Sequence, residues 1–211
     1  METVRKSDQT RELLLRAAFD EIHRNGFQAA SLSKILADTG LTKGALYHHF
    51  PNKTALGYAV VDELVTNEIT QRWLAPLENQ DDPITALRTL LQEAGKSLRP
   101  ADIMLGCPLN NLAQEMSPVD EGFRKRINHI YNVWRGAIAQ ALMRGQANGT
   151  VRTDIHPGET AAFLVAAMEG CVGMAKNARD PELLFNCGKS LIGYLESLRV
   201  THSDRPSPGR G

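Results

Sequence analysis

The stretch SLSKILADTGLTKGALYHHFPNK, residues 31–53, decides the fold. Ser31 is suited to cap a short helix that Gly40 ends, because a serine hydroxyl accepts hydrogen bonds from first-turn amides and glycine tolerates the left-handed conformation. Thr42 can cap a second short helix, which Pro51 stops because proline cannot continue a helix. Two short helices joined by a tight turn are the pattern of a helix-turn-helix.

The second of these helices has one face for packing and another for a partner. Leu46 and Phe50 are four residues apart and are expected to face inward. The small residues Gly44 and Ala45 would let the start of the helix approach a DNA groove closely. Polar side chains beside them, and hydroxyls or amines at the starts of neighbouring helices, could contact phosphates or base edges. The predicted DNA-binding residues are Ser31, Ser33, Thr42, Lys43, Gly44, Ala45, Tyr47, His48, His49 and Lys53.

Helical patterns flank this stretch on both sides, and no segment alternates as a strand would. A first helix carries Leu14, Ala18 and Ile22 on one face and ends at Asn25-Gly26. Further helices are expected over residues 53–74, 83–99, 108–115, 117–148, 157–177 and 181–198. The sequence therefore predicts an all-α fold of about nine helices.

The predicted helices divide into two domains and a tail. Residues 1–55 are expected to form a three-helix DNA-binding domain, and residues 56–200 a larger ligand-binding and dimerisation domain. Residues 201–211 are rich in Ser, Pro, Gly and Arg, a composition that favours a disordered tail.

Composition limits the function classes. Lys and Arg number 24, as do Asp and Glu, so the formal net charge is zero at pH 7. Nucleic-acid binders usually carry a basic excess, and residues 1–54 hold eight basic against six acidic residues. Neither a secretory signal nor an apolar run long enough to span a membrane is visible. Cys107, Cys171 and Cys187 lack paired spacing, which fits a reducing cytoplasm.

Residues 14–53 resemble the signature of the TetR family of transcriptional regulators. The resemblance is carried by LLRAA (14–18), GF (26–27), SL (31–32), Ile35, TGLTKGALYHHF (39–50) and NK (52–53). It implies a helix-turn-helix DNA reader, an all-helical ligand and dimer domain, and repression relieved by a small molecule. Three positions depart from the common pattern: Glu21 replaces an apolar residue, Ala30 a frequent Thr, and Leu36 an Ala.

The segment GCPLNNLAQE, residues 106–115, resembles a stretch found in one subset of that family. In some members a cysteine takes part in sensing reactive compounds. Cys107 would lie at the N-terminal end of a helix begun by Pro108, where the helix dipole favours the thiolate. Cysteine is also commonly a small buried hydrophobe, so a sensing role and a packing role both stay open. Cys171 and Cys187 lie within apolar helix faces and are expected to pack.

A small-molecule pocket is expected between the long helices. Aromatic and methionine side chains at helical spacing could line it, although such a stripe also suits a plain core. The candidate ligand-binding or sensing residues are Cys107, Met104, Phe123, Ile127, Tyr131, Trp134, Phe163 and Met168.

Two stripes near the C-terminus point to a homodimer. The small residues Ala162, Ala166, Gly170 and Gly173 would allow two helices to approach closely. With Leu184, Leu191 and Leu198 of the last helix they could build a four-helix interface across a two-fold axis, or pack within one subunit. The family resemblance favours the dimer.

The expected function is a ligand-responsive repressor. It would bind an inverted-repeat operator in double-stranded DNA as a homodimer and be released by a small-molecule effector, which could be thiol-reactive and sensed at Cys107. Alternatives are an activator of the same fold, an enzyme pairing Cys107 with His129 or His156, and a helical adaptor that binds only protein. We expect no cofactor, no metal site and no membrane association.

Overall fold

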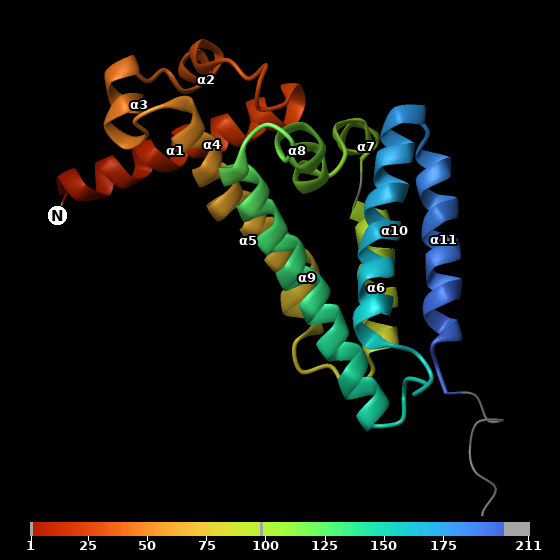
Figure 1. The fold of residues 1–211 in the computed structure, drawn as a ribbon. Helices are drawn as coiled ribbons and strands as arrows, with labels where there is room; N and C mark the ends of the chain where they lie inside the picture. The colour runs from red at the N-terminus through yellow and green to blue at the C-terminus, as the bar shows by residue number, and fades with distance from the viewer. Residues whose placement is uncertain (1, 98, 201–211) are drawn as a thin grey trace, which may run out of the picture. The chain divides into compact units, whose positions relative to one another are not determined.

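The computed structural model describes residues 2–97 and 99–200, nearly all of them in helices (Figure 1). Within these residues, strand-like pairing is limited to one bridge between Val151 and Arg199. The helices are α1 (Glu2–Asn25), α2 (Leu32–Thr39), α3 (Lys43–His49), α4 (Lys53–Ala59), α5 (Thr66–Ile69), α6 (Pro83–Ser97), α7 (Pro100–Leu105), α8 (Pro108–Met116), α9 (Glu121–Ala147), α10 (Pro157–Ala178) and α11 (Pro181–Ser197). The all-α prediction is confirmed. The predicted tail, residues 201–211, lies outside the described residues.

The helix expected over residues 53–74 forms, but its hydrogen bonding changes along its length. The segments η1 (Val60–Val65) and η2 (Thr70–Leu74) are π-helical, and η3 (Ala75–Leu77) is a 3-10 turn. A π-helix bonds residue i to i+5 and so widens the turn. The polar and apolar pattern of the sequence predicts the helix but not these two wide segments.

Two helix boundaries differ from the prediction. The short helix α7 begins at Pro100, where the sequence indicated only the end of the preceding helix. Helix α9 begins at Glu121 rather than near residue 117, because a turn precedes it and Asp120 Oδ1 accepts the Phe123 amide at 2.9 Å. Pro100 begins a new helix instead of only ending the previous one, and Pro118 lies in the turn before α9 rather than in its first turn.

The chain divides into two compact units. The first contains α1 to α5 with residues 105–131. Its core includes an aromatic cluster in which the Phe123 ring lies 4.6 Å from that of Phe27 and 5.0 Å from that of Tyr58. Gly57 passes directly beside this cluster. The start of α9 therefore belongs to the same core as the helix-turn-helix.

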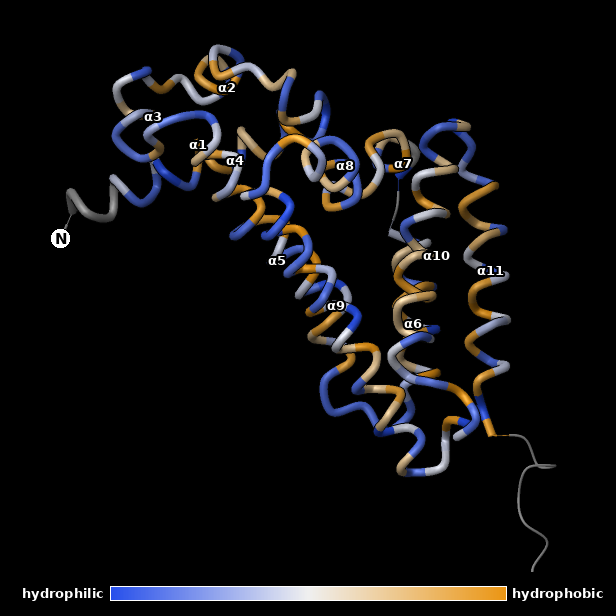
Figure 2. The backbone as a smooth tube through the Cα atoms, in the orientation of Figure 1, coloured by the Kyte–Doolittle hydropathy of each residue, from blue (hydrophilic) through white to orange (hydrophobic). Residues whose placement is uncertain are grey.

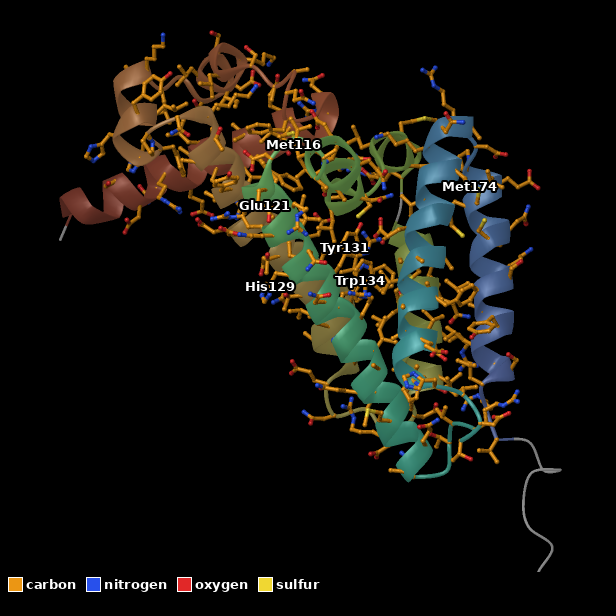
Figure 3. The ribbon with its side chains drawn as sticks, in the orientation of Figure 1. Met116, Glu121, His129, Tyr131, Trp134 and Met174 are labelled. Carbon is orange, nitrogen blue, oxygen red and sulfur yellow. The ribbon has the colours of Figure 1, made fainter. Side chains whose placement is uncertain are left out.

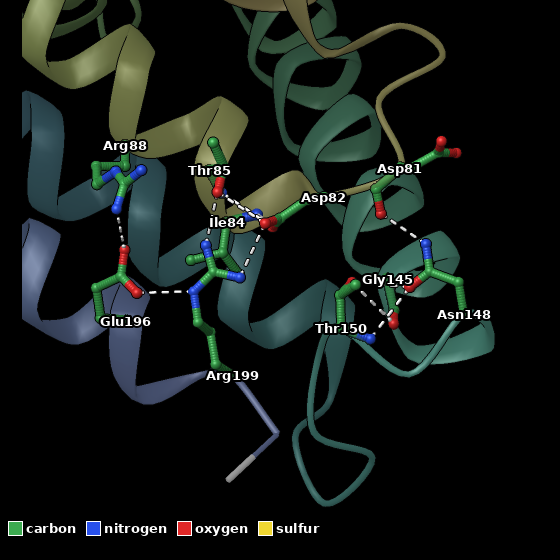
Figure 4. A network of polar contacts seen from close by, with 10 residues as sticks. All are labelled: Asp81, Asp82, Ile84, Thr85, Arg88, Gly145, Asn148, Thr150, Glu196 and Arg199. Carbon is green, nitrogen blue, oxygen red and sulfur yellow. Dashed lines mark hydrogen bonds and ion pairs between the residues drawn. The ribbon is translucent and has the colours of Figure 1, made fainter.

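The second unit contains residues 70–104 and residues from 132 onward, with α6 packed on α11 and α11 on α10. A polar network joins the start of α6 to the end of α11 (Figure 4). Asp82 Oδ2 accepts from Arg199 at 2.9 Å, and Glu196 accepts from both Arg199 and Arg88. Hydrophobic residues occupy much of α10, and hydrophobic and hydrophilic residues are mixed along α11 (Figure 2).

Candidate nucleic-acid interface

Side-chain caps fix the ends of α2 and α3. The Ser31 hydroxyl accepts the Lys34 amide at 3.3 Å, and the Thr42 hydroxyl accepts the Ala45 amide at 3.2 Å. Gly40 closes α2 with a φ of 66°, in the left-handed region. The expected caps and turn are thus confirmed, and the oxygens of Ser31 and Thr42 are engaged at their own helix starts.

The structure gives a role to Glu21, which stands where the family pattern usually has an apolar residue. Its side chain is buried, and Oε1 accepts the Ser31 amide at 3.0 Å. A carboxylate at the start of a helix satisfies an otherwise open amide and interacts favourably with the helix dipole. The acidic residue therefore holds α2 against α1. Sequence reasoning missed this role, because the acceptor comes from a different helix.

Helix α3 has the two faces that the sequence predicts. Leu46 and Phe50 are buried, whereas Lys43, Tyr47 and His48 are exposed. Ala45 and His49 are half-buried, and Gly44 and Ser33 are exposed. The predicted DNA-binding residues of α3 therefore share one outward region.

Nothing in the described protein requires glycine at position 44. A Cβ built there would meet only Thr42 Oγ1, at 3.8 Å, which is ordinary contact. The missing side chain leaves the start of α3 open to close approach by a partner.

The cations near α3 differ in their availability. Lys34 pairs with Asp38. Lys53 donates to the Gln28 carbonyl at 2.9 Å and lies 5.1 Å from the centre of the Phe27 ring. Lys43 has no ion pair among the described residues. The charge of Lys43 is therefore directly available, while Lys53 would have to exchange its carbonyl for a phosphate.

Burial lowers the pKa of His49, and the neighbouring His48 imidazole and Arg11 guanidinium lower it further. The two histidine rings lie 5.0 Å apart, and Arg11 stacks 5.3 Å from the centre of the Phe50 ring. At neutral pH the His49 ring is therefore largely uncharged. It can take part in a hydrogen bond rather than act as a fixed cation.

Helix α8 contacts the other side of the DNA-binding helices. The two carboxylate oxygens of Glu115 each accept one amide, from Phe27 and Gln28, both at 2.8 Å. His23 Nε2 lies 2.8 Å from the Gly106 carbonyl oxygen. The segment that sequence analysis singled out for Cys107 thus holds the loop between α1 and α2, and Glu115 is a residue whose role the sequence did not reveal.

The candidate ligand residues in the first unit lie in or near its core. Phe123 and Ile127 are buried, and Phe123 packs in the aromatic cluster with Phe27. The half-buried Tyr131 donates a long hydrogen bond, 3.5 Å, to Asn110 Oδ1. Tyr131 and Trp134 leave one side of α9 and His129 leaves the other (Figure 3). Phe123 therefore has a packing role in this structure.

The second unit contains the other aromatic candidates. Trp134 is 1% exposed, and its ring lies 5.5 Å from that of Trp73. Its indole Nε1 has no hydrogen-bond partner among the described residues. Met168 is buried, whereas Phe163 is 51% exposed and contacts the Tyr194 ring at 4.9 Å. Trp134 is thus the candidate with an unsatisfied polar atom in the interior.

Met104 is exposed and borders a pocket of about 690 Å³, which Gly173, Lys176, Asn177 and Arg179 also line. Cys107 is half-buried at the N-cap of α8, and its thiol makes no capping hydrogen bond. His156, a partner in the alternative enzyme hypothesis, caps α10 instead, with Nδ1 accepting the Glu159 amide at 3.3 Å.

The C-terminal stripes lie differently from the expected arrangement. Leu191 and Leu198 are buried within the subunit, so the predicted leucine stripe does not form an outward face. The residues outside are Phe163, Ala166, Gly170 and Met174 on α10, with Phe185 on α11. A Cβ at Gly170 would meet nothing within 4 Å. Of the small residues predicted for the interface, Ala166 and Gly170 are exposed, whereas Ala162 and Gly173 are half-buried. The leucines Leu191 and Leu198 instead join α11 to the rest of the subunit.

In the part of the chain that the structure describes, no helix is long and apolar enough to cross a membrane. The same residues contain no cluster of three His, Cys, Asp or Glu side chains suited to a metal ion.

Comparison with known proteins matches two segments of the chain to families. Residues 14–60 match the family described as bacterial regulatory proteins, tetR family. Residues 83–190 match the family described as transcriptional regulator LmrA/YxaF-like, C-terminal domain. The second match alone covers about half of the 211 residues.

Similar proteins agree with these matches. The chain is 27% identical over 171 residues to the transcriptional regulator AcuR of Cereibacter sphaeroides, covering 81% of this chain and 78% of that one. It is 27% identical over 159 residues to the HTH-type transcriptional repressor DhaR of Mycobacterium sp. strain GP1, covering 75% and 78%. A TetR transcriptional regulator from Chloroflexus aurantiacus superposes with a TM-score of 0.82 at 26% identity, covering 93% of this chain and all of that one. The chain belongs to the TetR family of transcriptional regulators.

Proposed function

We propose that this protein is a repressor that binds an inverted-repeat operator as a homodimer, with α3 in the major groove, and is released by a small-molecule effector. One observation carries the DNA-binding part. Lys43, Tyr47 and His48 are exposed together beside Gly44, whose missing side chain leaves the start of α3 unobstructed. The similar protein DhaR is a transcriptional repressor by name, which supports repression over activation here.

The exposed face of α10 and α11 supports the dimer. Phe163, Met174 and Phe185 are each more than half exposed, and Gly170 lies among them with open space beyond it. Exposed apolar side chains of this size on one face favour association with another protein surface. A second copy offers the same face, and a two-fold pair would place two α3 helices against two operator half-sites.

Trp134 supports effector binding in the second unit. Burying an indole N–H without a hydrogen bond costs free energy, so an effector with an acceptor atom could satisfy it. The adjacent Trp73 ring would supply an apolar wall. We therefore place the effector beside the Trp73–Trp134 pair.

Helix α8 is the proposed route to the DNA-binding helices. Its carboxylate Glu115 holds the backbone of Phe27 and Gln28, and Gln28 in turn accepts from Lys53. A displacement of α8 would therefore move the loop that positions α2. A thiol-reactive effector acting at Cys107 is the alternative input, supported by the position of this thiol at the N-cap of the same helix.

Operator binding tests the proposal. A duplex selected by the parent protein from a random-sequence library serves as the operator, and its affinity is measured by fluorescence anisotropy over a salt series. Lys43→Ala should weaken binding and flatten the log–log salt dependence by about 0.9, as expected for the loss of one phosphate contact. Tyr47→Phe should weaken binding by roughly 2- to 13-fold if the hydroxyl makes one hydrogen bond.

Lys96→Ala is the matched control, because Lys96 is an exposed helix lysine of the second unit. It should leave both affinity and salt dependence unchanged. If Lys43→Ala and Tyr47→Phe bind like the parent while folding normally, α3 is not the reading helix. Failure to select any duplex would favour the protein-binding adaptor. A promoter reporter separates repression from activation.

A further inference from the structure

Helices α10 and α11 form a hairpin whose register is fixed by its turn and one ring contact. Only residues 179 and 180 separate the helices, with Arg179 at a φ of 53° and Asp180 capping α11 through the Glu182 amide. Near the open end, the Phe163 ring contacts the Tyr194 ring at 4.9 Å. The two helices therefore run antiparallel side by side along their length.

This register brings two cysteines to the same level. Cys171 lies about two turns from Phe163 toward the connection, and Cys187 lies about two turns from Tyr194 toward the same connection. Both thiols are free and half-buried. Burial and a hydrogen-bonding interaction with the Cys187 thiol raise the pKa of Cys171 to about 12. The register therefore places the two cysteines at one level of the hairpin, on neighbouring helices.

Two neighbouring thiols can undergo a reaction that a purely packing role does not need, the formation of a disulfide. A single buried cysteine behaves as a small hydrophobe, whereas two adjacent thiols can be oxidised together. Partial exposure of both allows a small oxidant to reach them. A peroxide reacts with the thiolate form of a cysteine, and Cys187 is taken as the attacking residue.

We propose that Cys171 and Cys187 form a modification site at which a peroxide closes an intrachain disulfide between α10 and α11. The Cys187 thiolate attacks one peroxide oxygen, so that an S–O bond forms and the O–O bond breaks. The departing hydroxide takes up the proton that the Cys187 thiol released and becomes the first water. The Cys171 sulfur then attacks the sulfenic sulfur of Cys187, the S–S bond forms and the S–O bond breaks. Water leaves with the Cys171 proton. The thiols lose two electrons, and hydrogen peroxide is reduced to two waters.

The proposal is tested on the full chain carrying Cys107→Ser, so that the third thiol cannot react. Reduced protein is titrated with hydrogen peroxide, and free thiols are counted. The two thiols should disappear together and return together with dithiothreitol. Trypsin cleaves at Lys176 and Arg179, between the cysteines, so the oxidised digest should contain two peptides joined by a disulfide. On a non-reducing gel the chain should keep the mobility of a monomer.

Thermal unfolding supplies an independent readout. Closing this short loop should raise the midpoint by roughly 6–12 °C, because the cross-link restricts the unfolded chain. Cys171→Ser and Cys187→Ser, each in the same background, should show no rise after peroxide treatment. Loss of one thiol alone, a cross-link between chains, or sulfinic acid without a joined peptide would each overturn the proposal.

This inference does not depend on DNA binding. Operator affinity of the reduced protein is measured in parallel. If the disulfide forms in a protein that binds no DNA, the proposed function fails and the modification site stands. If DNA binds and no disulfide forms, the reverse holds.

Discussion

Gly44 and Gly57 are glycines for two different reasons, one concerning the protein surface and the other the packing of the core. A Cβ at Gly57 would lie 2.4 Å from Phe27 Cε2 and 2.7 Å from Phe123 Cζ, inside the aromatic cluster. At Gly44 a Cβ would meet only one atom, at 3.8 Å. The first glycine is required by packing, and the second leaves room for something outside the protein.

Gly57→Ala should therefore destabilise the fold by about 1–3 kcal/mol, the usual cost of overfilling a packed core. Urea unfolding followed by circular dichroism measures the difference. Both rings belong to large side chains packed on all sides, so little relaxation is expected. An unchanged midpoint would mean that the cluster can open at low cost.

Gly44→Ala should have the opposite profile. Replacing an exposed helical glycine with alanine favours the helix by up to about 1 kcal/mol, so the unfolding midpoint should hold or rise. Operator affinity should fall, because the methyl group would separate α3 from the groove floor. If the variant binds DNA as tightly as the parent, the DNA does not approach α3 closely at Gly44.

The helix boundaries show what local sequence can and cannot predict. The caps at Ser31 and Thr42 follow from short-range chemistry, since donor and acceptor lie three residues apart, and both are confirmed. The roles of Glu21 and Glu115 depend on partners in other segments, so no local pattern signals them. Helix α7 was missed for a related reason, because its leading proline suits either the end of one helix or the start of the next.

Helix α8 is the element whose loss should affect the DNA-binding helices. Glu115→Ala leaves the amides of Phe27 and Gln28 without their acceptor and should cost about 1–3 kcal/mol. Glu115→Gln keeps one carbonyl acceptor and should cost less. Thermal unfolding and operator affinity measure the effect, with the exposed neighbour Gln114→Ala as the control. Equal behaviour of Glu115→Ala and Gln114→Ala would argue against α8 as the proposed route.

The network between α6 and α11 should make stability depend on pH. Burial, the largest influence on Asp82, raises its pKa, but hydrogen bonds from Thr85 and Arg199 outweigh burial and leave the pKa below the usual 3.8. A lowered pKa in the folded state adds stability above the unfolded value, and that stability is lost as pH falls through the folded value.

Asp82→Asn should therefore be less stable than the parent at pH 7 and should match it at pH values below the folded pKa of Asp82. Urea unfolding of both proteins between pH 7 and pH 2.5 tests this convergence. A constant difference across the range would show that the charge of Asp82 is not what stabilises the network.

For the molecule as a whole, the dimer face gives the sharpest prediction. Gly170→Glu places a charge where the protomer has open space, so the isolated subunit should fold normally. In the proposed dimer the carboxylate would be buried without a partner, which costs several kcal/mol. Sedimentation should show a dimer for the parent and a monomer for the variant, at micromolar concentration.

Gly95→Glu is the matched control, because Gly95 is an exposed glycine of α6 whose Cβ would also meet nothing within 4 Å. It should remain dimeric. If the parent is a monomer, or if Gly170→Glu is still a dimer, the exposed face of α10 and α11 is not the dimer interface.

The outward face of the C-terminal hairpin was only partly predictable. Small residues on α10 indicated a place of close approach, and Gly170 does lie at the surface. The leucine stripe of α11 has the same helical spacing whether it packs inside or outside, and it packs inside. Helical periodicity identifies which residues share a face but not what packs against that face. For the same reason it cannot distinguish a core position from a ligand contact at Phe123, which is buried against Phe27.

The hydrogen bonds from the loop between α1 and α2 to Glu115 also make hydrogen exchange in that loop sensitive to the position of α8. An amide that donates to a carboxylate exchanges its hydrogen with solvent more slowly than an open loop amide. Gln28 is an exposed loop residue, yet its amide should be protected while α8 is in place. Deuterium uptake at Phe27 and Gln28 would then follow the position of α8 in solution, without any label and without DNA.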